Sequence, residues 1–375
     1  MSELPTLRTP TELAVRRRRL SSFLESNDLE AIWVARPNNF AWLTGGSNVV
    51  SRDSPIGVAA AGYQRDGGFR VLTNSIEADR LRDEELPAEF SVTALEWYTD
   101  SLAEAIVSES PTPAAADFAV EGLSEVDCSA LRQPLSTEDL ERYRAFGSET
   151  TTAVERVCRG LSTAHTERAA ATEVRSALEA RGITAPVVLV GSANRTQQYR
   201  HYTPTTAELG DYALVSVTAQ RGGLYTSLTR TVVFEKPAWL DERFHAAASV
   251  EATALAATQR AGRDGAPARA VFEAIQRAYE AVGWSEEWQS HHQGGAAGFA
   301  GREWIATPDC TRRVHVPQAY AWNPTVQGAK SEGTVLVTAA GLEPLTLSES
   351  WPTVSVSPTE PTDHRRIERP APLSV

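Results

Sequence analysis

The sequence has almost no lysine. Lys236 and Lys330 are the only lysines among 36 basic residues, so every other basic residue is an arginine. Acidic residues outnumber basic ones and the formal net charge is −12. This charge disfavours nucleic acid as a partner, because binding to phosphates requires clustered cations. Acidity with so little lysine predicts a halophilic protein, from a microbe that accumulates salt; a GC-rich genome is the alternative explanation of the arginine bias.

Cysteine and long apolar runs are also scarce. Cys128, Cys158 and Cys310 are scattered without a paired spacing, which argues against a disulfide framework or a zinc ribbon and fits a reducing cytoplasm. Residues 1–5 contain no basic region followed by an apolar stretch, and no later segment reaches about 18 uninterrupted apolar residues. We therefore expect a cytoplasmic protein that neither enters nor contacts a membrane.

The residue pattern changes once along the chain, and this change predicts two domains. Up to about residue 120, short apolar strands alternate with helical patterns, which indicates a small α/β domain in residues 1–133. A proline, a capping residue and two acids near residue 134 mark a helix start. From there to residue 357, two helices followed by strands occur twice, which predicts an α+β domain with an internal duplication. The proline-rich, charged segment 358–375 is predicted to be a disordered tail.

A further absence concerns carboxylates in two adjacent strand patterns. The segments ALVSVTA and GLYTSLTRT, within residues 211–234, contain Ser216 and Ser227 but no aspartate or glutamate. Their outline resembles the metal-binding hairpin of the creatinase, prolidase and aminopeptidase P family, in which an aspartate is expected at each serine. Two divalent ions bring roughly four positive charges, which hard oxygen anions must offset. A serine hydroxyl is neutral and cannot do this.

Three other segments carry the same resemblance. The sequence PNNFAWLTGG at 37–46 is similar to a family segment, and its local role is a helical turn closed by glycines. In relatives, a histidine followed by an aromatic residue and a proline lies over the scissile bond, and His201 in RHYTP at 200–204 falls on this position. Its imidazole, with an ordinary pKa of about 6.5, suits proton transfer near neutrality. The segment HHQGGAAGF at 291–299 resembles the family's histidine-glycine turn.

The resemblance implies five metal-ligand positions, which fall on Ser216, Ser227, His292, Ala339 and Glu349. Only His292 and Glu349 are chemically able to bind a metal, and even one catalytic zinc usually takes three protein ligands. A shifted alignment that puts Glu343 in place of Ala339 is the alternative. We therefore predict that the chain holds no catalytic metal and no cofactor.

The resemblance also implies the fold and the assembly. It covers residues 13–356 and predicts a "pita-bread" second domain, whose curved sheet cradles the site between two duplicated halves. Relatives are mostly homodimers, so a homodimer is expected. The family loop that corresponds to Arg52 reaches toward the site of the partner subunit.

The predicted site combines these matches with the aromatic residues near the presumed cleft. The predicted catalytic residues are His201, His292 and Glu349. The predicted substrate-binding residues are Arg52, Tyr202, Tyr225, Ser227, His291, Gln293, Arg302, Trp322 and Trp351. Because adjacent residues of an extended segment point to opposite faces, only one of the two neighbouring histidines is expected to face a given point, and His292 is favoured.

Three functions remain open at this stage. The first is metal-independent hydrolysis of a C–N bond in a small amino-acid-like or short-peptide substrate, as in creatinase. The second is a non-catalytic module that binds a peptide or a small ligand, a use of this fold in a eukaryotic histone chaperone subunit. The third is a metal-dependent peptidase that cleaves Xaa-Pro bonds, for which most of the ligands are missing.

Overall fold

The computed structural model describes residues 10–66, 68–360 and 362–375. The chain divides into two compact units, Met1–Glu138 with Gly222–Leu224, and Asp139–Arg221 with Tyr225–Val375. The expectation about residues 1–5 lies outside the described ranges. Within those ranges, no helix is both long and apolar enough to cross a bilayer.

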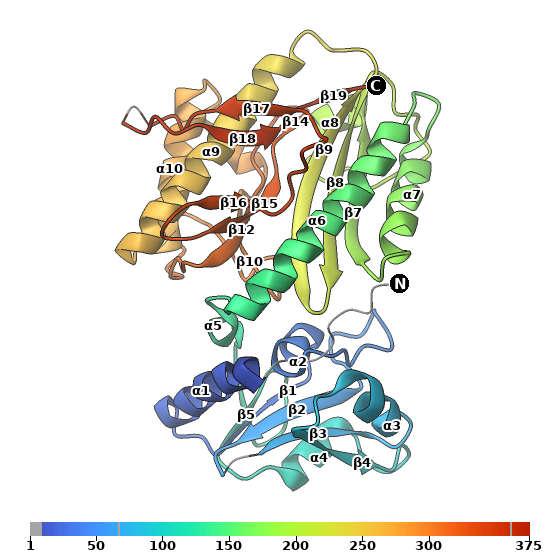
Figure 1. The fold of residues 1–375 in the computed structure, drawn as a ribbon, viewed down its shortest axis with the longest axis vertical. Coiled ribbons are helices and arrows are strands. Elements are labelled where there is room, and N and C mark those ends of the chain that lie inside the picture. The colour runs from blue at the N-terminus through green and yellow to red at the C-terminus, as the bar shows by residue number, and fades with distance from the viewer. Residues whose placement is uncertain (1–9, 67, 361) are drawn as a thin grey trace. The chain divides into compact units, whose positions relative to one another are not determined.

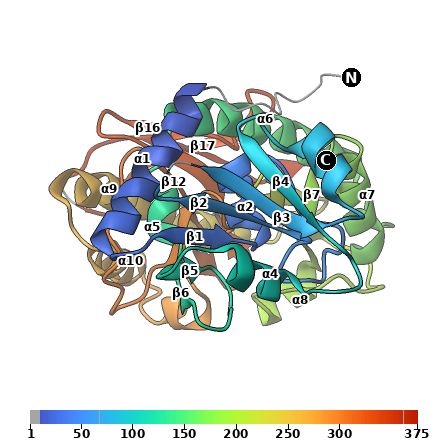
Figure 2. The ribbon, with the colours of Figure 1, turned by 90° about the horizontal axis from the view of Figure 1, so that it is seen from below.

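The first unit is built on a mixed six-stranded sheet in the order β4-β3-β2-β1-β5-β6, which Figure 2 shows. Its elements are α1 (Pro10–Ser26), β1 (Ala31–Val34), α2 (Pro37–Thr44), β2 (Ala59–Gln64), β3 (Phe69–Asn74), α3 (Ala78–Arg80), η1 (Leu81–Glu85), β4 (Phe90–Leu95), α4 (Leu102–Glu109), β5 (Ala114–Ala116), β6 (Ser124–Glu125) and α5 (Ser129–Arg132). The two central pairs, β3 with β2 and β2 with β1, are antiparallel, and the outer pairs are parallel. The α/β character predicted for this part of the chain is confirmed.

The segment PNNFAWLTGG forms helix α2, and its glycine ends the helix. Gly45 has a φ of 84°, a left-handed conformation that glycine adopts without strain, and its N–H donates to the Ala41 carbonyl. Asn39 in the same helix donates to Asp117 Oδ2 at 2.7 Å. The motif is therefore a structural element of the first unit, as its sequence predicts.

The second unit contains two helix pairs, each followed by strands (Figure 1). The first half comprises α6 (Thr137–Gly160), α7 (Glu167–Glu179), β7 (Thr184–Ser192), α8 (Ala193–Gln198), β8 (Tyr212–Arg221) and β9 (Leu224–Val233). The second half comprises α9 (Leu240–Asp264), α10 (Ala268–Ala281), η2 (Glu287–Ser290), β10 (Gly294–Ala297), β11 (Trp304–Ile305), β12 (Gln318–Trp322), β13 (Thr325–Val326), β14 (Ala329–Lys330), β15 (Gly333–Val337), β16 (Leu342–Pro344) and β17 (Thr353–Val356). The order of the strands is β11-β10-β12-β15-β9-β8-β7, so the halves join where β15 pairs with β9.

The core of the second unit lies between the helices α9 and α10 and the sheet. Helix α10 buries Val271, Ile275 and Tyr279, whose spacing of about one helical turn places them on one face. They pack in one cluster with Tyr320 and Trp322 of β12. Each fully buried valine or isoleucine stabilises the fold by roughly 1.5–3 kcal/mol. This packing holds rigid the strands that carry the site.

The C-terminal segment is ordered, so the prediction of a disordered tail is wrong. Strand β18 (Ile367–Pro370) pairs with β17, and β19 (Leu373–Ser374) pairs with β9. Arg369 is buried and bonds to the carboxylate of Glu251 in α9. Composition alone predicts that a charged tail is exposed to solvent. In the folded chain, Glu251, which is distant in sequence, offsets the buried charge of Arg369.

Candidate functional site

A pocket of about 510 Å³ lies on the sheet of the second unit. Its volume suits a small ligand, because drug-sized sites span roughly 300–1,000 Å³. Both halves contribute to its walls. Its polar lining includes His201, Ser216, His292, Arg302, Lys330 and Glu332.

A chain of hydroxyl groups leads from the first half to a buried carboxylate of the second. Thr229 Oγ1 donates to Glu332 Oε2 at 2.6 Å. Since an ionised carboxylate only accepts, the single hydroxyl proton of Thr229 is used there, so Ser216 donates to Thr229 at 2.7 Å. Tyr202 in turn donates to Ser216 at 2.8 Å. Each hydroxyl group therefore donates toward Glu332, in the order Tyr202, Ser216 and Thr229.

Glu332 is the anion of a buried ion cluster. Lys330 Nζ lies 2.9 Å from Glu332 Oε2, and Arg302 Nη2 lies 3.2 Å from Glu332 Oε1. Burial alone raises the pKa of Glu332, but Lys330 and Arg302 outweigh it and lower the pKa to about 2. Glu332 is thus ionised at neutral pH. It is a counter-ion and too weak a base to take a proton from water.

Arg302 also reaches the first half. Its Nη1 donates to Ser227 Oγ at 3.1 Å, and Ser227 Oγ lies 3.0 Å from Thr218 Oγ1. The Arg302 guanidinium therefore contacts β9 directly at Ser227, which in turn is hydrogen-bonded to Thr218 of β8. One fixed cation and neutral hydroxyl groups occupy this region of the pocket.

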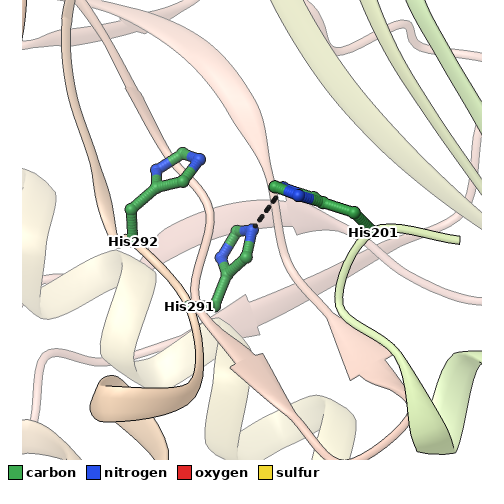
Figure 3. A group of neighbouring side chains, drawn as sticks. All are labelled: His201, His291 and His292. Atoms are coloured by element: carbon green, nitrogen blue, oxygen red, sulfur yellow. Dashed lines mark hydrogen bonds between the residues drawn. The ribbon is translucent and has the colours of Figure 1, made fainter.

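Three imidazoles converge beside the ion cluster (Figure 3). His201 follows α8, while His291 and His292 follow η2. His201 Nε2 lies 3.2 Å from His291 Nε2, and one nitrogen of each ring lies within 4.8 Å of one nitrogen of each other ring. His291 is buried, whereas His201 and His292 are exposed. The rings of His291 and His292 stack with centroids 4.4 Å apart, and of the two only His292 lines the pocket.

Burial and neighbouring cations keep two of these imidazoles neutral. Burial, followed by the charge of Lys330, lowers the pKa of His291 to about 2. His292 keeps part of its surface exposed, but burial of its ring nitrogens among neighbouring groups, followed by the charge of Arg302, lowers its pKa to about 4. Glu332 opposes both shifts without reversing them. At neutral pH, His291 and His292 are therefore uncharged and offer lone pairs.

Two residues that line the pocket each carry a buried polar atom with no hydrogen-bond partner among the described residues. The atoms are Asn323 Oδ1, an acceptor, and Arg302 Nε, a donor. Because an unpaired buried polar group is costly, at about 1–3 kcal/mol, these atoms are suited to complete their bonds with a ligand.

Several predicted site residues lie elsewhere. Glu349 is exposed after β16 and does not line the pocket, so the structure does not bring it together with His201 and His292. Ala339 is exposed as well, and its carbonyl accepts from Arg263. Glu332 is linked to Ser216 through Thr229 and to Ser227 through Arg302. Arg52 is exposed on a loop of the first unit.

The predicted tryptophans and Gln293 are structural. Trp322 is buried in β12 and donates to Thr258 Oγ1 at 3.1 Å. Trp351 is buried and donates to the Ala371 carbonyl at 2.8 Å. Gln293 donates to the His291 carbonyl at 2.6 Å and accepts from Tyr279, so it anchors the histidine segment from behind. None of the three lines the pocket.

The remaining predicted residues lie in or beside the pocket. His201, His292, Tyr225 and Arg302 line the pocket, and Tyr202, Ser227 and His291 bond to side chains in or beside it. Sequence reasoning missed Lys330, Glu332 and Asn323. The rarity of lysine was the available signal: one of only two lysines is buried in the site.

Comparisons with known proteins give the family. Residues 141–339, just over half of the chain, match the model of metallopeptidase family M24. The chain therefore belongs to metallopeptidase family M24, and its second unit is a pita-bread domain, as predicted. No protein of curated function matches it by sequence.

Solved structures share this fold at low identity. The prolidase from Pyrococcus furiosus superposes with a TM-score of 0.71 at 17% identity, covering 88% of this chain and 100% of its own. The Xaa-Pro dipeptidase from Bacillus anthracis gives 0.69 at 13%, covering 90% and 98%. The N-terminal domain of FACT complex subunit SPT16 from chickpea, Cicer arietinum, gives 0.65 at 14%, covering 89% and 96%.

The family implies a metal centre, and the residues present do not fit it. The two hairpin positions are the hydroxyls of Ser216 and Ser227, which bond to Thr229 and Arg302. The one carboxylate of the pocket, Glu332, is already neutralised by Lys330 and Arg302. Two divalent ions would enter beside these fixed cations with a single acidic ligand, which is electrostatically unfavourable.

Proposed function

We propose that this protein is a metal-independent hydrolase that cleaves a C–N bond in a small amino-acid-like or short-peptide substrate. Membership of the M24 family supports hydrolysis of a peptide-like bond. The observation that carries the proposal is the convergence of imidazoles at a pocket in which the fixed cations Lys330 and Arg302 already neutralise the lining carboxylate of Glu332.

His201 is the proton-transfer group in this proposal. It lines the pocket, and its Nε2 contacts Nε2 of the buried, neutral His291, which orients the ring. In the reaction, the oxygen of a water molecule adds to the carbon of the C–N bond while His201 accepts the proton of that water. The same proton then passes to the leaving nitrogen as the C–N bond breaks, so the imidazole ends unchanged.

The other pocket groups fit a substrate with amino-acid character. Lys330 and Arg302 present positive charge toward a carboxylate or a developing oxyanion, and Arg302 Nε is an unused donor. Asn323 Oδ1 is an unused acceptor for an amine or amide N–H. Fixed charges of this kind hold the scissile bond over His201 and need no reorganisation during the reaction.

A non-catalytic binding module is the second candidate. Its support is the likeness to the N-terminal domain of the chickpea FACT complex subunit SPT16, which shares this fold. The imidazoles favour the hydrolase, because a module that only binds has no need of convergent titratable groups. A metal-dependent Xaa-Pro peptidase is disfavoured by the poor fit of the pocket to a metal pair.

The proposal is tested by a hydrolysis screen in the presence of a strong chelator. Mixtures of Xaa-Pro dipeptides, N-acyl amino acids and guanidino acids are incubated with the protein, and the products are read by mass spectrometry. The expected result is hydrolysis of one class by the native chain and loss of that activity in His201→Ala. Binding of a ligand without turnover would favour the binding module, and turnover only after addition of manganese would favour the metal-dependent peptidase.

The same proposal includes a cytoplasmic homodimer adapted to salt. The net charge of −12 supports the salt adaptation, because screening weakens repulsion between like-charged surfaces. We expect the dimer to loosen at low ionic strength. Light scattering in dilute and in molar salt checks this, and an unchanged mass would contradict it.

A further inference from the structure

We propose that His201, His291 and His292 form a site for one divalent transition-metal ion of the zinc class. It includes one of the five family ligand positions, His292, but not the two on the hairpin, Ser216 and Ser227. Its members come from two segments, one after α8 and one after η2, that the fold brings together (Figure 3).

The nitrogen positions match such an ion. A tetrahedral zinc with Zn–N bonds of about 2.0–2.1 Å holds two ligand nitrogens about 3.3 Å apart. His201 Nε2 and His291 Nε2 are 3.2 Å apart, so an ion can replace the proton that now lies between them. One nitrogen of His292 lies within 4.8 Å of one nitrogen of each of the other two rings, and among the described residues no hydrogen bond restrains its ring. Rotation of that ring closes the remaining gap.

The chemistry of the ligands selects the ion. Imidazole suits zinc, copper, nickel and cobalt, whereas magnesium, calcium and manganese prefer carboxylate and carbonyl oxygens. The trio contains no carboxylate. The site therefore discriminates against manganese, and three protein ligands leave the fourth position of a zinc-class ion open to water.

The surrounding charges set the strength of binding. Lys330 acts electrostatically on His291 and His292, and Arg302 on His292, so both oppose the entry of a cation. Glu332 acts in the opposite direction but is engaged by both cations. The ion is therefore held more weakly than in a structural site with four ligands, and it can exchange with the medium.

Binding of the ion has a consequence for catalysis, which rests on the proposed function. An ion on His201 Nε2 replaces the contact with His291 that orients the proton-transfer ring. It also brings positive charge beside Lys330 and Arg302. Zinc is therefore expected to inhibit metal-independent hydrolysis, and the metal-binding inference itself stands on the geometry alone.

Cobalt titration tests the site directly. The chain is first stripped with chelator and carries Cys310→Ser, because Cys310 is the least buried of the free thiols. Tetrahedral cobalt absorbs strongly in the visible range, so the expected result is an intense band that saturates at one ion per chain. Zinc should displace this band, and manganese should not. Absence of the band at saturating cobalt would overturn the inference.

Single variants assign the ligands. His201→Ala, His291→Gln and His292→Ala are each expected to weaken cobalt binding at least tenfold. His364→Ala, which removes an exposed histidine near the C-terminus, is the matched control and should bind as the native chain does. Because His291 is buried, circular dichroism is used to check that the His291→Gln variant folds. His201 and His292 are exposed, so their variants test the site even if the His291 variant does not fold. Unchanged affinity in the variants of His201 and His292 would overturn the site.

The hydrolysis assay separates the two proposals. One bound zinc that abolishes turnover supports both of them. One bound zinc that raises turnover supports the site and contradicts metal-independent catalysis. Turnover in chelator without any cobalt band supports the function and overturns the site.

Discussion

The two halves of the second unit share a pattern of elements but contribute different chemistry to the pocket. The first half supplies mainly hydroxyls, which include Ser216, Ser227 and Thr229, together with His201. The second half supplies the charges and two further imidazoles: Lys330, Glu332, Arg302, His291 and His292. Duplication has therefore preserved the frame while the side chains diverged.

This difference supports the proposal that the site acts without metal charge. The hydroxyl groups on β8 and β9 are neutral, so they need no cation as a counter-ion. Lys330 and Arg302 instead offset Glu332, the one acid that remains. The chain from Tyr202 through Ser216 and Thr229 links the two halves by hydrogen bonds alone.

Removal of His201 tests whether the first half contributes any reactive group, and it has the largest expected effect. General acid–base catalysis by one side chain contributes about 10²–10⁴-fold, so His201→Ala should lower kcat by at least about 100-fold. Steady-state kinetics in chelator measure this, with His364→Ala as the control. A loss smaller than about tenfold would assign the proton transfer to the second half.

Neutralising Glu332 tests the ion cluster of the second half. Glu332→Gln leaves Lys330 and Arg302 buried without their counter-ion, and removal of one partner of a buried pair costs about 3–5 kcal/mol. Urea unfolding of the native chain and the variant measures the difference. Glu349→Gln, at an exposed glutamate, should change stability by no more than about 0.5 kcal/mol. Equal effects of the two variants would contradict the described cluster.

The pH dependence of stability tests the second half without substituting any residue. The folded pKa values of His291 and His292, about 2 and about 4, lie below the ordinary 6.5, so the unfolded chain binds more protons below about pH 6.5. Their contribution is therefore present above this pH and is lost as the pH falls. Glu332, whose pKa is lowered to about 2 from 4.5, adds a further loss below about pH 4.5.

The double variant His291→Gln/His292→Gln should flatten the upper part of this profile, between about pH 6.5 and 4.5, and leave the acid limb. Urea unfolding at a series of pH values measures both limbs. A native profile that does not fall on acidification through this range would show that the two imidazoles are not held neutral.

The smallest expected effect concerns the hydroxyl chain of the first half. Ser216→Ala removes the acceptor of Tyr202 and the donor to Thr229, and leaves the buried Tyr202 hydroxyl unpaired. We expect a loss of about 1–3 kcal/mol in unfolding free energy. Thr206→Ala, at an exposed threonine, is the control, and urea unfolding is again the measurement. Stability equal to that of the control would mean that these hydroxyl hydrogen bonds contribute nothing to the free energy of unfolding.

Local patterns were sufficient to predict much of the fold. The helix pairs and the strands around Ser216 and Ser227 follow from apolar periodicity, and His201 and His292 follow from the short motifs around them. These signals lie within a few residues of one another, so the sequence displays them directly. The family fold then follows from their order.

The site was only partly predictable because its decisive contacts are distant in sequence. Glu332 meets Thr229 and Arg302 across strands, and a Lys-Ser-Glu sequence resembles a solvated turn. The positions of Ala339 and Glu349 relative to the pocket depend on the register of β15 and β16. Pairing with β9 sets this register in the folded chain, and the sequence alone does not display it. The charged tail became a strand for the same reason: Glu251 offsets the buried charge of Arg369.

The most direct test of a site without the family's metal pair is the manganese content of the native chain. The protein is stripped with chelator, dialysed against excess manganese, washed, and measured by mass spectrometry together with protein concentration. Because the pocket has one neutralised carboxylate and two fixed cations, the expected result is well under one ion per chain. Two tightly bound ions per chain would contradict the account.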